Sequence, residues 1–231
     1  MPGGQWQGAE KIENNGMKKL LILDFDGTMG DTRSLIVRTM RQTLEHLGLP
    51  MQSEEACAAM IGLPLRETFT QLMPMSEETG RRCEETYNRL FTANNVAGAV
   101  PLFEGVRETV AEVFSRGVTV TIASSRGRDS LADFVRDLGL SPYIAHLVSA
   151  WDVEHAKPAP DMVLRLLKLT GMAAADALVV GDTKYDIMMG RSAGVDTCGV
   201  TYGNGLLREL VEAGATHVAD CFSDILPLVL E

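Results

Sequence analysis

The sequence predicts an α/β protein whose doubly wound parallel sheet is interrupted after the first strand by an all-helical insert. Three observations predict this architecture. In the second half of the chain, short β-branched runs alternate with segments of helical spacing. Residues 32–99 show helical spacing and no strand signal. The 231 residues, 45% of them hydrophobic, suffice for one large core and a modest insert.

The first half of the chain is predicted to hold one strand and then helices. The strand is expected over Leu20–Phe25, which is apolar until it meets two aspartates. Asp31 or Thr32 can cap the helix that follows. The apolar residues that share one face of this helix are Ile36, Met40, Leu44 and Leu47. Further helices are expected over 53–60, 65–72 and 76–91.

From Pro101 onward, helices and strands are predicted to alternate. Helices are expected near 105–115, around 131–138, and over 161–169 and 185–193. Between them lie the candidate strands "VTVTIASS", "HLVSA", "ALVVGD" and "VDTCGV". Together with the first strand they make about five strands with the composition of a buried parallel sheet. In such sheets ligands bind beyond the carboxyl ends of the strands.

The pattern divides the chain into three parts. Residues 1–16 are polar and glycine-rich and are expected to form a flexible leader. Residues 17–31 and 100–231 are expected to form the α/β core, and residues 32–99 the helical insert.

Composition and charge exclude several classes of function. A net charge of -10 and a pI near 4.9, with no basic stripe, argue against a nucleic-acid partner. No apolar run reaches the roughly 18 residues of a membrane span. The four cysteines are far apart and form no CxxC pair, which favours reduced thiols over a disulfide frame or a zinc site. A cytoplasmic protein is the default expectation, and the oligomeric state is not predicted.

Polar side chains gather at the predicted carboxyl ends of three strands and in one loop. They are Asp24, Asp26, Ser124, Ser125, Lys157, Asp182 and Asp186. Several carboxylates in one crevice repel each other unless a cation is bound, and magnesium prefers oxygen ligands of this kind. Because magnesium also accepts a substrate phosphate as a ligand, the pattern points to phosphoryl chemistry.

The same residues resemble a known family. "DFDGT" at 24–28, the hydroxyl of Ser124, "KPAP" at 157–160 and "GDTKYD" at 181–186 occur in the order of the four motifs of the haloacid dehalogenase-like phosphatases. The resemblance covers residues 20–231 and implies a Rossmann-like core. The insert resembles the cap domain of the phosphoglycolate phosphatase and β-phosphoglucomutase branch, with "MIGLPLRETF" at 60–69 as the segment that faces the substrate.

The resemblance implies a role for each matched residue. Asp24 would attack phosphorus and form an aspartyl-phosphate, and Asp26 would protonate the leaving group and later deprotonate water. Ser124 would bind a phosphoryl oxygen, and Lys157 would neutralise charge on the transferred group.

The implied metal site consists of Asp24, Asp182 and the backbone carbonyl of Asp26 around Mg²⁺. Asp186 would support the metal shell or Lys157. Thr28 would bind its own turn through its hydroxyl, and Ser125 is a further supporting residue.

Three arginines have two open interpretations. Arg66, in the insert, either contacts a carboxylate or second phosphate of the substrate or forms a surface salt bridge. Arg126 and Arg128, just after the second motif, either do similar work or are solvated. "YGNG" at 202–205 is interpreted as a turn.

These residues and the resemblance predict a magnesium-dependent phosphatase that acts on a small phosphorylated metabolite. A phosphoglycolate-like monoester is the first candidate for the substrate. The alternatives are a β-phosphoglucomutase-like sugar phosphomutase, a pyrophosphatase and a nucleotidase. A phosphate-binding sensor without turnover would have no need of Asp26. A dehalogenase is disfavoured because a departing halide needs no acid.

Overall fold

The computed structural model describes residues 16–96 and 98–231. The leader predicted over residues 1–16 therefore lies, except for Gly16, outside the described residues, and its flexibility stays a prediction.

A parallel sheet forms the centre of the fold, as the sequence predicted, and it has six strands where about five were expected. Its strands lie in the order β3-β2-β1-β4-β5-β6, and every neighbouring pair is parallel. Their bounds are β1 (Leu20–Leu23), β2 (Thr119–Ser124), β3 (Ile144–Ser149), β4 (Ala177–Gly181), β5 (Asp196–Val200) and β6 (His217–Ala219). The chain enters at the middle of the sheet and extends it to both sides, which is the doubly wound topology.

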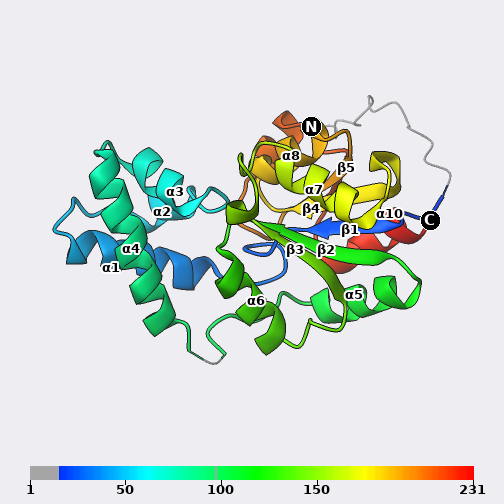
Figure 1. Cartoon of the computed structure of the whole chain (residues 1–231), viewed down its shortest axis with the longest axis horizontal. Coiled ribbons are helices and arrows are strands. Elements are labelled where there is room, and N and C mark those ends of the chain that lie inside the picture. The colour runs from blue at the N-terminus through cyan, green and yellow to red at the C-terminus, as the bar shows by residue number, and fades with distance from the viewer. Residues whose placement is uncertain (1–15, 97) are drawn as a thin grey trace, which may run out of the picture.

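Helices cover both faces of the sheet (Figure 1). Side chains of a strand alternate between faces, so Leu21 and Leu23 of β1 join one apolar cluster and Leu20 and Ile22 join the other. The first cluster includes side chains of α5 (Val106–Ser115), α6 (Arg128–Asp137) and α10 (Leu226–Leu230). The second includes side chains of α7 (Asp161–Thr170) and α8 (Lys184–Ser192). Burial on both faces explains why β1 is wholly apolar.

Four helices form a separate layer at one end of the sheet (Figure 1). They are α1 (Arg33–His46), α2 (Glu54–Ala58), α3 (Leu65–Leu72) and α4 (Glu77–Asn94). Serine hydroxyls cap two of them: Ser53 Oγ accepts from the Ala56 N–H at 3.1 Å, and Ser76 Oγ accepts from the Thr79 N–H at 3.2 Å. These helices lie in the range predicted for the insert. We call them the cap, and the division of the chain into two folding units stays a prediction.

Among the α-helices and strands of the described residues, one strand and two helices were not predicted from the sequence. They are β6, α9 (Leu207–Glu212) and α10, all in the last part of the chain. Each is three to six residues long, too short for a 3.6-residue or 2-residue hydrophobic period to become visible. β6 also lies at the edge of the sheet and pairs only with β5, so it needs no continuous apolar run.

Two further observations concern the whole described region. The four cysteines are free, which agrees with the predicted absence of a disulfide frame. Among residues 16–96 and 98–231, no helix combines the length and the apolar character needed to cross a membrane.

Two leucines on α7 test the core packing directly. Leu166 is fully buried against the sheet, whereas Leu164 is 48% exposed on the same helix. We expect Leu166→Ala to lower the free energy of unfolding by about 2–5 kcal/mol because it leaves a cavity. The matched control Leu164→Ala should change it by less than about 0.5 kcal/mol. Urea denaturation measures both, and equal effects would contradict the two-face packing.

Candidate active site

The residues predicted for the site follow the carboxyl ends of neighbouring strands. Asp24 comes directly after β1 and Asp182 directly after β4. The Asp24 N–H donates to the carbonyl of Val180 at 2.9 Å, which extends the pairing of the two strands to the site. Gly27 has a φ of +86°, so the chain can turn sharply after Asp26. The parallel sheet thus brings together residues more than 150 positions apart.

Three buried carboxylates form a cluster there. Asp24, Asp182 and Asp186 each present an oxygen, and these oxygens lie within 4.8 Å of one another. Burial, together with repulsion from Asp186, Asp182 and Asp26, raises the pKa of Asp24 well above its ordinary value, against the opposing effect of Lys157. Burial and Asp186 likewise raise the pKa of Asp182 to about 7. The cluster therefore requires compensating positive charge.

Lys157 supplies one such charge. Its Nζ forms an ion pair with Asp24 and lies 2.7 Å from Asp186 Oδ1. The side chain is completely buried. Burial alone would lower the pKa of Lys157, but the carboxylates of Asp186 and Asp24 outweigh it and raise that pKa. Lys157 is therefore charged and holds two of the three acids.

Asp186 and its neighbours fix the start of α8. Asp186 Oδ2 accepts from the N–H of Thr183 at 3.0 Å and from its hydroxyl at 2.7 Å, which forms a capping box. The other oxygen faces Lys157. Of the two roles predicted for Asp186, the structure contains the contact with Lys157.

Both oxygens of Asp182 are oriented by hydrogen bonds. The Thr28 hydroxyl donates to Oδ1 at 3.1 Å. Asn204 donates to Oδ2 through its backbone N–H at 2.6 Å and through Nδ2 at 3.1 Å. The Thr28 hydroxyl was predicted to bind its own turn, and in the structure it instead donates to Asp182. A short side chain next to the turn can reach the neighbouring strand end, which sequence spacing does not reveal.

The turn at 202–205 contributes to the site in a way that the sequence analysis missed. A Cβ atom on Gly203 would lie 2.3 Å from Asp182 Cβ, and one on Gly205 would lie 2.1 Å from the Asp182 carbonyl oxygen. Only glycine allows this loop to approach closely enough for Asn204 to bind Asp182. The two glycines flanking an asparagine were the available signal, but nothing in the sequence placed the loop beside Asp182.

The two serines after β2 have different partners. The hydroxyl of Ser124, which is buried, accepts from the N–H of Arg126 at 3.2 Å. The hydroxyl of Ser125 donates to the carbonyl of Gly62 at 2.7 Å. Gly62 belongs to the cap segment predicted to face the substrate, so Ser125 joins the cap to the core.

Asp26 lies outside the acidic cluster and pairs with Arg126. Arg126 Nε donates to Asp26 Oδ2 at 3.2 Å, and Nη2 forms a second, short contact with Oδ1. This is the planar, two-bond geometry that arginine forms with carboxylates. The side chains of Arg126 and Asp26 are only 8% and 13% exposed. Arg128 is 52% exposed, and its Nη1 lies 3.6 Å from Asp152 Oδ2.

A cleft of about 900 Å³ lies between the cap and the core beside these residues. The core contributes Asp24, Asp26, Ser125 and Arg126 to its lining, and the cap contributes residues 61–68 and part of α4. Arg66 lines the cleft and also forms a salt bridge with Glu84, with 3.0 Å between Nη2 and Oε2. The structure thus shows the salt bridge proposed for Arg66, in a position that still faces the cleft.

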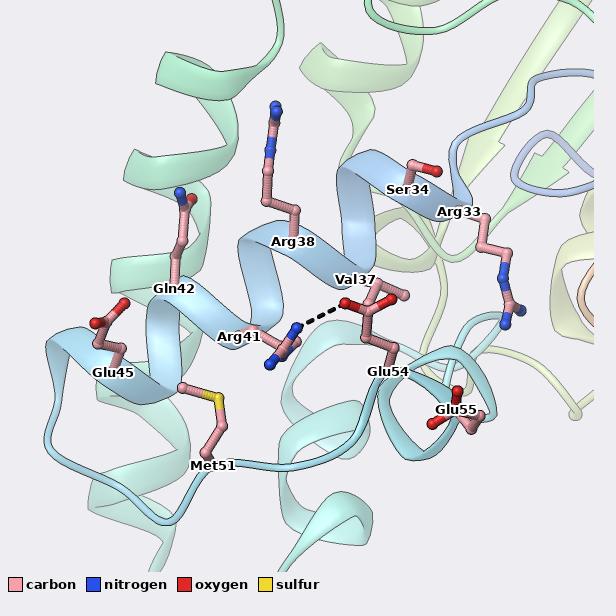
Figure 2. Close-up of a pocket in the computed structure, with 10 residues that line it drawn as sticks. All are labelled: Arg33, Ser34, Val37, Arg38, Arg41, Gln42, Glu45, Met51, Glu54 and Glu55. Carbon is pink, nitrogen blue, oxygen red and sulfur yellow. Dashed lines mark hydrogen bonds and ion pairs between the residues drawn. The ribbon is translucent and has the colours of Figure 1, made fainter.

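A second hollow, of about 660 Å³, lies on the cap between α1 and α2 (Figure 2). Its most prominent contact is the ion pair between Arg41 Nη1 and Glu54 Oε1, at 2.7 Å. None of the residues predicted for the site lines it. The cleft beside Asp24 is therefore the candidate active site.

Comparison with known proteins places the chain in a family. A sequence profile described as "Haloacid dehalogenase-like hydrolase" matches residues 21–200. The protein named "Probable phosphatase IndB" of Dickeya dadantii (strain 3937) is 34% identical to this chain, over 90% of this chain and 92% of its own length. A "Pyrophosphatase PpaX" of Bacillus velezensis is 30% identical over 79% of this chain and 82% of its own length. A "Phosphoglycolate phosphatase" of Pectobacterium atrosepticum is 29% identical over 90% of this chain and 91% of its own length.

Solved structures show the same fold. The crystal structure of a predicted phosphatase from Clostridium acetobutylicum superposes with a TM-score of 0.85 at 20% identity, covering 92% of this chain and 98% of that one. The profile match and the full-length relatives agree with the four motifs at the strand ends. The chain belongs to the haloacid dehalogenase-like hydrolases, in the branch that resembles the phosphoglycolate phosphatases.

Proposed function

We propose that this hydrolase is a magnesium-dependent phosphatase that cleaves a small phosphate monoester, such as phosphoglycolate, through an aspartyl-phosphate on Asp24. One observation carries the proposal: the carboxylate of Asp24 is buried at a strand end beside a cation, Lys157, and opens onto the cleft under the cap. The relatives named as phosphatases support it.

The reaction has two displacements. In the first, the Asp24 carboxylate attacks phosphorus, the bond from phosphorus to the ester oxygen breaks, and Asp26 gives that oxygen a proton. In the second, Asp26 takes a proton from water, the water oxygen attacks phosphorus, the bond from phosphorus to the Asp24 oxygen breaks, and inorganic phosphate leaves. Lys157 neutralises negative charge on the transferred group, and the Ser124 hydroxyl binds one of its oxygens.

The residues present fit a magnesium ion. Three buried carboxylates have one buried lysine among them, so negative charge remains uncompensated, and all donors are the oxygens that Mg²⁺ prefers. Asp24, Asp182 and the backbone carbonyl of Asp26 would hold the ion, with Asp186 alongside. When bound, magnesium would withdraw charge from the phosphoryl oxygens.

Pyrophosphate hydrolysis is the second candidate function, because several relatives of similar identity are named "Pyrophosphatase PpaX". The nucleophile, lysine and acidic cluster would serve both reactions, and the leaving group alone would differ. A sugar phosphomutase would use the same first displacement and return the phosphoryl group to a sugar. We further propose that the protein acts in the cytoplasm on a small phosphorylated metabolite.

Replacement of the nucleophile tests the mechanism. We expect Asp24→Asn to lower kcat for release of phosphate from p-nitrophenyl phosphate by at least about 1,000-fold, because the amide cannot form the covalent intermediate. Asp176→Asn is the control, since Asp176 pairs with Lys19 on the surface. Rapid acid quenching of the wild type should trap phosphate on Asp24, and a phosphorylated residue elsewhere would contradict the assignment.

The metal site predicts an unusual dependence of stability on pH. The pKa of Asp182 is about 7 in the folded state against an ordinary 3.8. The folded state therefore binds more protons in this window, and stability must fall as the pH rises through it. In EDTA, we expect the free energy of unfolding to fall more between pH 5 and pH 8 for the wild type than for Asp182→Asn.

At pH 8, added Mg²⁺ should raise the free energy of unfolding of the wild type far more than that of Asp182→Asn, because the ion binds only the folded site. Urea denaturation at both pH values measures this difference. An equal gain for both proteins would show that Asp182 holds no magnesium.

A panel of substrates separates the candidate functions. We expect kcat/KM for 2-phosphoglycolate to exceed that for pyrophosphate by about 10-fold or more, since a site built for one leaving group rejects another that leaves its polar groups unpaired. A higher value for pyrophosphate would favour the second candidate. Interconversion of glucose phosphates without release of phosphate would identify a mutase.

A further inference from the structure

Arg126 lies between the core and the cap. Its guanidinium lies 4.7 Å from the ring centre of Phe91, on cap helix α4, and 4.8 Å from that of Phe134, on core helix α6. Its Nη1 donates to the Ser130 hydroxyl at 3.1 Å. Three of its five N–H groups are thus used by Asp26 and Ser130, and the side chain still lines the cleft.

The charges around the cleft are mostly negative. Among the described residues that line it, the arginines Arg66 and Arg126 are the only cationic side chains. The acidic residues of the lining are Asp24, Asp26, Glu67, Glu84, Asp129, Asp133, Asp137 and Glu154. Each arginine is paired with one of these acids, Arg66 with Glu84 and Arg126 with Asp26. A second anion on the substrate would therefore compete with a protein carboxylate for either arginine.

Arg126 is better placed than Arg66 for this exchange. The side chain of Arg66 is 60% exposed, so solvent weakens its interaction with an anion, whereas that of Arg126 is 8% exposed. The backbone N–H of Arg126 also binds the hydroxyl of Ser124, which in the proposed function binds the phosphoryl group. Arg126 thus adjoins both the acid and the phosphate-binding hydroxyl.

The ion pair has a direct consequence for the proposed chemistry. Both oxygens of Asp26 accept from Arg126, so the direction of the carboxylate is set by this arginine. Another partner for Arg126 would release Asp26 to turn toward the ester oxygen of a substrate. Because the guanidinium already holds a carboxylate through two parallel contacts, its geometry suits a second carboxylate.

We propose that Arg126 selects phosphate esters with a carboxylate near the ester oxygen, by exchanging Asp26 for the substrate's carboxylate and so freeing Asp26 for proton transfer. This inference rests on the proposed function, because it assigns Asp26 as the acid. It adds a residue that determines substrate specificity. It also explains why a substrate without the carboxylate leaves Asp26 paired with Arg126.

Binding of two phosphonates that cannot be hydrolysed tests the exchange. The ligands are 3-phosphonopropionate, which carries the carboxylate, and propylphosphonate, which does not. In calorimetric titrations with Mg²⁺ present, we expect wild type to bind the first about 10- to 100-fold more tightly, as for a charge-assisted contact. Arg126→Gln should abolish this preference, and the neighbouring control Arg128→Gln should retain it.

A second pair of variants separates exchange from a structural role. Asp26→Asn removes the charge that competes for Arg126, so it should bind 3-phosphonopropionate more tightly than wild type and widen the preference over propylphosphonate. Arg126→Lys, which keeps the charge but lacks the planar fork, should retain an intermediate preference. A merely structural Arg126 would weaken both ligands equally.

Several results would overturn the inference. They are an unchanged preference in Arg126→Gln, weaker binding of 3-phosphonopropionate by Asp26→Asn, and loss of the preference in Arg66→Gln instead. A dependence on Arg126 for methylenediphosphonate but not for 3-phosphonopropionate would assign the residue to a second phosphoryl group. Because these are binding measurements, they stand apart from hydrolysis of p-nitrophenyl phosphate, whose absence in wild type would reject the proposed function alone.

Discussion

The contact of Lys157 with Asp24 and Asp186 is the interaction on which the candidate site depends. Three carboxylates within 4.8 Å of one another, all buried, would repel strongly without a cation. Lys157 joins the segment after β1 to the start of α8, and it does so from a loop that belongs to neither. Burial raises the pKa of Asp24, and Lys157 opposes that rise by favouring the charged carboxylate.

A second layer of contacts fixes the directions of these acids. Thr28 and Asn204 orient the oxygens of Asp182, and Thr183 orients Asp186 while it caps α8. The loop that carries Asn204 can approach only because glycines flank it. The oxygens that face the cluster are thus held before any ligand arrives, which lowers the cost of binding a cation.

Asp26 pairs with a different cation from Asp24, although the two acids are only two residues apart. Asp24 is held from within the core by a lysine, whereas Asp26 is held by Arg126, which lies against aromatic rings of both the core and the cap. A movement of α4 would change the surroundings of Arg126 through Phe91. The acid of the proposed reaction is therefore linked to the cap through Arg126.

The sequence by itself determined the parallel α/β fold and the set of polar residues at the strand ends, because long apolar runs and local motifs report directly on burial and turns. It did not reveal β6, α9 or α10, which are too short to show a period. Only the tertiary structure decided the partners: Asn204 beside Asp182, the Thr28 hydroxyl on the same acid, and Arg126 on Asp26. Such pairings join residues 22 to 154 positions apart, and their geometry depends on how the strands and the cap pack, which no local pattern records.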